Sequence, residues 1–328
     1  MLLTCILLIL QTSQSIPFLA QPEVQEKNAR LYENVEIRQT DIIKPDTLYN
    51  AGLMKSRGGH LYVLDYQPVP RIVKIDPGNN AIVREYGNGR GRGPGELLNP
   101  TDFAISGNGS VWIADNPTSR ISVFDQDSRY RKEWVIRHIP YKLAFTRRDD
   151  ILIHSSVNPT IKLADSLRNI LWNSEPLVEK PERWASVISG FVLAESNSAF
   201  FISNYAGFMV KYDERGSVSW IRRTINYDEN VPVNPIPGDE GRGYQVDRRK
   251  LGHAVANGFV RDDQLFVLVQ FLEDREADPQ QVIDVYSTSD GSYEYSIRLP
   301  KSVRAISHLE EDILVGLQSN RVVLWKFK

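Results

Sequence analysis

The chain has 328 residues, of which 41% are hydrophobic and 24% charged, and its formal net charge at pH 7 is −2. The apolar fraction excludes a mostly disordered protein. The near-neutral charge provides no long-range field for capturing nucleic acid, which requires a strong basic excess, so we expect no nucleic-acid partner.

The N-terminus has the pattern of a secretory signal peptide. Residues 2–10 form the apolar run LLTCILLIL, and the polar stretch QTSQS follows at 11–15. This run is too short to cross a bilayer, which takes about 20 residues, so we expect no integral membrane span. We expect a leader over residues 1–20, cleaved after Ser15 or after Ala20, and export to the periplasm or the extracellular space. The alternatives are an N-terminal core strand or an uncleaved anchor.

The only cysteine, Cys5, lies inside the apolar run. After cleavage the mature chain would contain no cysteine. This excludes disulfides, cysteine-based zinc sites and cysteine nucleophiles, so the hydrophobic core must hold the fold unaided.

A strand-like pattern recurs six times along the rest of the chain. The apolar runs are LYVLD at 61–65, VWIAD at 111–115, ILIHS at 151–155, FFISN at 200–204, LFVLVQ at 265–270 and ILVGLQ at 313–318. A polar turn precedes each run, and further strand patterns such as RIVKID at 71–76 follow most of them. Four strands in a unit of about 50 residues, repeated six times, predict an all-β fold, a six-bladed β-propeller of four-stranded blades over residues 21–328.

The last unit predicts how the ring closes. Only one strand pattern, RVVLWKF at 321–327, remains after the sixth run, so this blade lacks one strand. The segment LYENVEIRQ at 31–39 alternates apolar and charged residues. We expect it to pair with residues 321–327 and to complete the last blade, because closure removes the unpaired faces of the first and last units.

One stretch carries a family resemblance. Residues 89–125, GRGRGPGELLNPTDFAISGNGSVWIADNPTSRISVFD, resemble one NHL-type repeat almost in full, and residues 61–76 resemble its second half. The chain is thus similar to the NHL/TolB-like six-bladed propellers, within them to a secreted or periplasmic group of Bacteroidetes-type bacteria. Units three to six depart from the repeat, because His154 and Ser155, Asn204, and glutamines stand where the repeat has aspartate.

The resemblance implies a ring of polar side chains at the ends of the second strands, on one face near the central opening. Its members are Asp65, Asp115, His154, Asn204, Gln270 and Gln318. Oxygen ligands of this kind suit a cation such as calcium or a polar ligand. The alternative is that these residues cap hairpins or pair with Arg71 and Arg120.

Two loops are further candidates. The loop GRGRGPGE at 89–96 carries Arg90 and Arg92, which could bind an anion, while the simpler interpretation of the loop is an inter-blade turn. The long stretch at 226–252, with Arg242 in an echo of that loop, joins units four and five and is a candidate specificity loop. A second insert at 173–186 could border the same rim.

Catalytic patterns are weak. No HExxH or G-x-S-x-G motif is present. We therefore predict a non-enzymatic, monomeric binding or scaffold module without cofactor that recognises a protein, peptide or glycan through its loop-rich face. The alternative is a metal-dependent hydrolase or lactonase, with calcium at the central opening held by Asp65, Asp115 and Asn204, and with His154 or His253 as the base.

Overall fold

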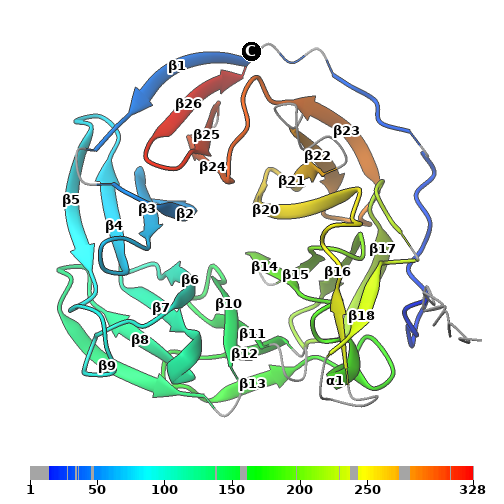
Figure 1. Ribbon diagram of the computed structural model, residues 1–328, viewed down its shortest axis with the longest axis horizontal. Coiled ribbons are helices and arrows are strands. Elements are labelled where there is room, and N and C mark those ends of the chain that lie inside the picture. Colours follow the sequence, from blue (N-terminus) through cyan, green and yellow to red (C-terminus); the bar gives the residue numbers. More distant parts are fainter. Residues whose placement is uncertain are drawn as a thin grey trace, which may run out of the picture.

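The computed structural model describes residues 15–27, 29–33, 35, 37–45, 48–136, 139–155, 161–196, 198–228, 230–236, 243–272, 281–310 and 312–327. The predictions for residues 1–14 and for Arg242 lie outside this range. Six four-stranded antiparallel sheets follow one another around a ring (Figure 1). The prediction of an all-β, six-bladed propeller is therefore confirmed.

Each blade begins with its innermost strand and ends with its outermost one. Blade one contains β2 (Ala51–Arg57), β3 (His60–Asp65), β4 (Arg71–Asp76) and β5 (Ala81–Tyr86). Blade two contains β6 (Pro100–Ile105), β7 (Val111–Asp115), β8 (Arg120–Phe124) and β9 (Tyr130–Val135). Blade three contains β10 (Pro140–Phe145), β11 (Ile151–Ser155), β12 (Ile161–Ala164) and β13 (Ile170–Asn173).

The second half of the ring repeats this order. Blade four contains β14 (Gly190–Glu195), β15 (Ser198–Ser203), β16 (Phe208–Tyr212) and β17 (Val218–Arg223). Blade five contains β20 (His253–Arg261), β21 (Gln264–Phe271), β22 (Gln281–Ser287) and β23 (Tyr293–Arg298). Blade six contains β24 (Ala305–Glu310), β25 (Ile313–Leu317), β26 (Val322–Phe327) and, from the N-terminal part of the chain, β1 (Ile37–Ile43).

The N-terminal strand closes the ring, but it lies further along the chain than the sequence pattern predicts. β1 pairs with β26 in antiparallel register, from Ile37 opposite Phe327 to Ile43 opposite Val322. Of the predicted segment 31–39 only its last part belongs to this strand, whereas Tyr32 bridges Ser296 of blade five. The physical reason is Ile43, which is 1% exposed in the apolar layer between blades six and one and fixes the register of β1.

The hydrophobic core is divided among the junctions between neighbouring blades. Six clusters of buried side chains fill the six junctions, because the short apolar runs place side chains on both faces of each sheet. Inside the ring, the innermost strands of all six blades line a channel of about 260 Å³. There the Lys55 ammonium lies 2.9 Å from the Asp102 carboxylate and donates to the carbonyl of Leu143, which ties together blades one, two and three.

Residues 15–27 and 29–33, which we call the N-terminal strap, follow the outer side of the ring from the junction of blades three and four to blade five (Figure 1). Phe18 packs edge-on against Phe208 at 4.9 Å between ring centroids, and Ile16 and Phe18 are 6% and 9% exposed in the core cluster of blades three and four. Glu23 bridges Arg222 on the outermost strand of blade four. Arg30 forms an ion pair at 2.9 Å with Asp284, a fully buried carboxylate of blade five.

The two inserts singled out in the sequence pack on each other. The insert at 173–186 contains the short helix α1 (Pro181–Trp184), and the stretch at 226–252 contains the hairpin of β18 (Val233–Pro235) and β19 (Tyr244–Val246). The ring centroids of Trp184 and Tyr244 lie 4.9 Å apart. The only other described helix is the one-turn η1 (Asn116–Thr118), so no helical layer covers the described part of the ring.

Candidate functional site

The aspartates at the ends of the second strands in blades one and two are bound by the chain itself. The Asp65 carboxylate accepts the backbone N–H groups of Tyr49 and Asn50, at 3.3 and 2.7 Å. The Asp115 carboxylate accepts those of Leu98 and Asn99, at 3.2 and 2.7 Å. Both side chains are fully buried. Each therefore anchors the loop that leads into its own blade.

The glycine-rich loop at 89–96 is organised as an inter-blade turn. Arg120 donates hydrogen bonds to the carbonyls of Arg92, Gly93 and Glu96. The N–H of Gly93 donates to the Glu96 carboxylate at 2.7 Å, and the side chains of Arg90 and Arg92 are exposed. Because the loop satisfies these polar groups internally, its backbone does not present the N–H cradle that an anion site requires.

Blades two to four, together with Tyr66 directly after β3 of blade one, line a polar cavity of about 630 Å³, which we call the blade 2–4 cavity. It is lined by residues that stand at strand ends or on innermost strands: Tyr66, Asn99, Pro100, Thr101, Tyr141, Lys142, His154, Ser189, Gly190, Asn204, Tyr205 and Arg248. The structure thus brings together two predicted site residues, His154 and Asn204. Arg248 comes from the predicted specificity loop, which therefore contributes to this cavity.

Polar atoms of the cavity wall lack partners within the described chain. His154 is 2% exposed, and neither its Nδ1 atom nor the Oδ1 atom of Asn204 has a hydrogen-bond partner there. An unpaired buried polar atom costs about 1–3 kcal/mol, so such atoms call for an explanation. In blades one and two, by contrast, the carboxylates of Asp65 and Asp115 at the equivalent position have hydrogen-bond partners.

Burial also sets the protonation state of His154. It lowers the pKa of the imidazole from 6.5 to about 3, and the positive charge of Lys142 adds to the effect. Lys142 lies directly opposite His154 in the β10–β11 pairing, which places both side chains on the same face of the sheet. His154 is therefore neutral at pH 7, and the cations at this wall are Lys142 and Arg248.

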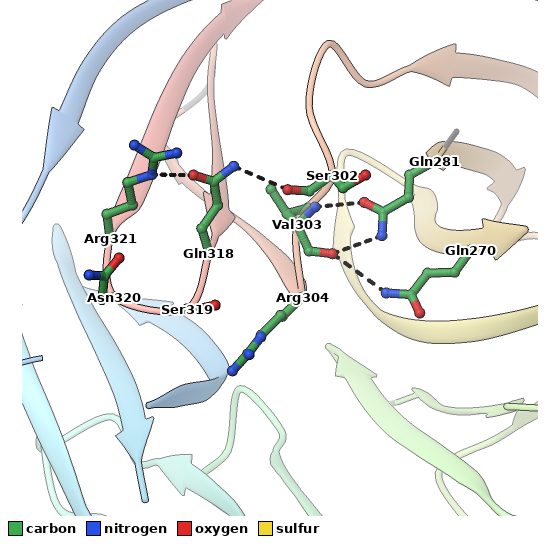
Figure 2. A pocket seen from close by; sticks show the side chains of 9 residues that line it. All are labelled: Gln270, Gln281, Ser302, Val303, Arg304, Gln318, Ser319, Asn320 and Arg321. Atoms are coloured by element: carbon green, nitrogen blue, oxygen red, sulfur yellow. Dashed lines mark hydrogen bonds between the residues drawn. The ribbon is translucent and has the colours of Figure 1, made fainter. Parts of the chain in front are cut away.

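A second cavity lies between blades five and six (Figure 2). It measures about 450 Å³ and contains the predicted residues Gln270 and Gln318. Gln270 and Gln281 donate to the Val303 carbonyl, at 3.5 and 2.9 Å, and Gln318 donates to that of Ser302 at 3.1 Å. These glutamines hold the loop before β24 in place.

His253 lies apart from both cavities. It begins β20, and its pKa is lowered first by burial and then by the charge of Arg30 from the strap. The six side chains of the predicted ring therefore fall into three pairs. Asp65 and Asp115 are buried and hold their own loops, His154 and Asn204 line the blade 2–4 cavity, and Gln270 and Gln318 bind the loop before β24. His253 does not join His154 at one site.

The arrangement does not fit the alternative expected from the sequence, a calcium ion held by Asp65, Asp115 and Asn204. The Asp65 and Asp115 carboxylates are occupied by backbone N–H groups. Among the described residues, no group of three or more His, Cys, Asp or Glu side chains is placed to hold a metal ion.

Sequence reasoning missed most of the cavity wall. Tyr66 and Tyr205 directly follow Asp65 and Asn204, so an aromatic residue after the second strand was an available signal. Lys142 could have been found from the hairpin register, which places it opposite His154. Arg248 had no local signal, because only the packing of the long loop brings it to the cavity.

Fold and site together define a closed six-bladed β-propeller with polar cavities where its second strands end. Residues 97–124 match the family model of the NHL repeat, which confirms the resemblance to NHL-type propellers seen in the sequence. No curated protein matches the chain. Within the described residues, no helix has the length and apolar character needed to traverse a bilayer.

Solved structures share this fold at low sequence identity. A Bacteroides fragilis protein named as exported has a TM-score of 0.60 and 12% identity, covering 93% of this chain and 98% of that one. A member of the DUF4221 family from Bacteroides vulgatus has a TM-score of 0.60 and 12% identity, covering 90% and 98%. Virginiamycin B lyase from Staphylococcus aureus has a TM-score of 0.52 and 13% identity, covering 89% and 99%. At these identities the likeness concerns the fold alone, and the two Bacteroides proteins fit the group expected from the sequence.

Proposed function

We propose that this chain is an exported, non-enzymatic binding propeller that takes its ligand, a glycan or a segment of peptide or protein, in the blade 2–4 cavity. The observation that carries the proposal is the set of unpaired polar atoms on His154 and Asn204 in a cavity of about 630 Å³. This volume falls within the roughly 300–1,000 Å³ typical of ligand sites. A polar ligand would supply the missing hydrogen-bond partners.

The protonation state of His154 favours binding over catalysis. A general base works best when its pKa lies near the operating pH, and a group whose pKa is about 3 accepts a proton weakly at neutral pH. The lyases with a similar fold differ from this chain at nearly nine positions in ten, so their activity is not transferred.

Export is supported by the apolar run at residues 2–10 and by the Bacteroides neighbour named as exported. Of the two expected cleavage positions, we favour the one after Ser15. Cleavage after Ala20 would remove Ile16 and Phe18 from the core cluster of blades three and four, whereas cleavage after Ser15 keeps them. Mass spectrometry of the mature protein secreted by an expressing cell measures this directly. A mature chain that begins at Gln21 would contradict the assignment.

Two bulky substitutions test the binding site. Asn99 and Asn320 are both exposed, and they line the blade 2–4 cavity and the blade 5–6 cavity, respectively. We expect arrays of saccharides and peptides to bind the wild type and the Asn320→Trp control but not the Asn99→Trp variant. Ligands eluted from the wild type should keep their mass. Equal binding by all three proteins would refute the site, and a converted ligand would refute the non-enzymatic function.

A further inference from the structure

We propose that the blade 2–4 cavity binds a saccharide that carries a carboxylate, an inference that rests on the binding function proposed above. The first argument is the composition of the wall. Among the described residues that line it, the apolar groups are Pro100 and the rings of Tyr66, Tyr141 and Tyr205, and none is a valine, leucine, isoleucine or methionine. Pockets for apolar side chains are lined predominantly by hydrophobic residues, whereas most of the described residues of this wall are polar. The C–H face of a sugar ring packs well against aromatic rings that carry a polar tip, as these tyrosines do.

The second argument is the kind of hydrogen-bonding group that the wall offers. Asn99, Thr101, Ser189 and Asn204 present neutral amides and hydroxyls, and the neutral imidazole of His154 adds one donor and one acceptor. A sugar hydroxyl donates and accepts at the same time, so it matches such groups without leaving one unpaired. The unpaired Oδ1 atom of Asn204 would receive a hydroxyl proton.

The third argument is charge. The described lining residues include Lys142 and Arg248, and none of them is an aspartate or glutamate. Among the described residues, none accepts a hydrogen bond from the half-buried Lys142 ammonium, while the Arg248 guanidinium lies 5.4 Å from the centre of the Tyr205 ring. A carboxylate is the group that pairs with a cation at this depth, because charge-assisted hydrogen bonds are the strong ones. A sugar acid supplies the carboxylate and the hydroxyls in one molecule.

Titration calorimetry on the full mature chain tests the inference. The probes are trisaccharides of galacturonate, glucuronate, mannuronate and guluronate, the methyl ester of each, and neutral galactotriose. We expect at least one uronate trisaccharide to bind, and its methyl ester to bind roughly tenfold or more weakly, because the ester has lost the charge.

Lys142→Met should weaken binding of the uronate to the level of the ester and leave binding of the ester unchanged. Lys44→Met is the matched control, because this exposed lysine after β1 lies outside the lining of the cavity, so removing its charge should not affect binding. Melting temperatures equal to that of the wild type show that both variants are folded.

The possible results distinguish a failure of the inferred sugar acid from a failure of the proposed binding function. Equal affinity for a uronate and its ester, or no effect of Lys142→Met, overturns the role of the carboxylate. If no uronate binds but Asn99→Trp abolishes binding of an arrayed peptide, the saccharide class is wrong and the binding site stands. If Asn99→Trp changes no binding at all, the proposed function itself fails.

Discussion

Blades one and two use the end of the second strand for folding, whereas blades three and four use the same position to line a cavity. Asp65 and Asp115 are fully buried and accept backbone N–H groups of the preceding loops. His154 and Asn204 leave polar atoms unpaired at the wall of a cavity. An acceptor that its own backbone satisfies is not available to a ligand. The departures from the repeat, rather than the repeat itself, therefore mark the candidate site.

The blades that lack the aspartate are also those that receive outside support. The N-terminal strap inserts Phe18 between blades three and four and pairs Arg30 with Asp284 of blade five, and β1, which follows the strap in the chain, completes blade six. We infer that long-range contacts of the strap compensate for the lost local anchor.

Deletion of residues 15–33 should have the largest effect. It removes the buried Ile16 and Phe18, worth about 1.5–3 kcal/mol each, and leaves Asp284 without its Arg30 partner, which typically costs about 3–5 kcal/mol. We expect the melting temperature in calorimetry to fall by about 10–20 °C. Arg30→Ala alone should lower the melting temperature only by the share that comes from the lost ion pair with Asp284. An unchanged melting temperature would show that the strap is not a structural element.

Asp115→Ala and Asn204→Ala should lower the free energy of unfolding by different amounts. This difference tests the contrast between blades two and four. The first removes hydrogen bonds to two backbone N–H groups and to Thr118, so we expect a loss of about 3 kcal/mol in urea unfolding. The second removes an unpaired Oδ1 atom and should cost less than about 1 kcal/mol. Asp127→Ala, at an exposed turn, is the control. Equal costs at positions 115 and 204 would mean that both blades use the position structurally.

The smallest effect should be a change in the pH dependence of stability. The pKa of His154 is about 3 in the folded chain and about 6.5 when unfolded, so the unfolded state binds more protons between these values. Stability contributed by neutral His154 is complete above pH ~6.5 and is lost as the pH falls toward ~3, by about 1.4 kcal/mol per pH unit at most.

Replacing His154 by Gln removes this proton linkage. Between pH 4 and 6 the variant should therefore lose less stability on acidification than the wild type, as urea midpoints at each pH would measure. Parallel pH profiles for the two proteins would indicate that His154 titrates normally and is open to solvent.

The amino-acid sequence by itself determined the blades. Runs such as VWIAD at 111–115, with polar turns at regular spacing, specify strands and their apolar faces through neighbours close along the chain. Even the closing of the last blade was visible, because the count left one strand missing. Only the tertiary structure decided that β1 starts at Ile37, that the strap runs from the junction of blades three and four to blade five, and that Lys142, Asn204 and Arg248 line one cavity. These side chains come from separate blades and a long loop. No local pattern specifies their proximity, because it arises only when the blades pack around the ring.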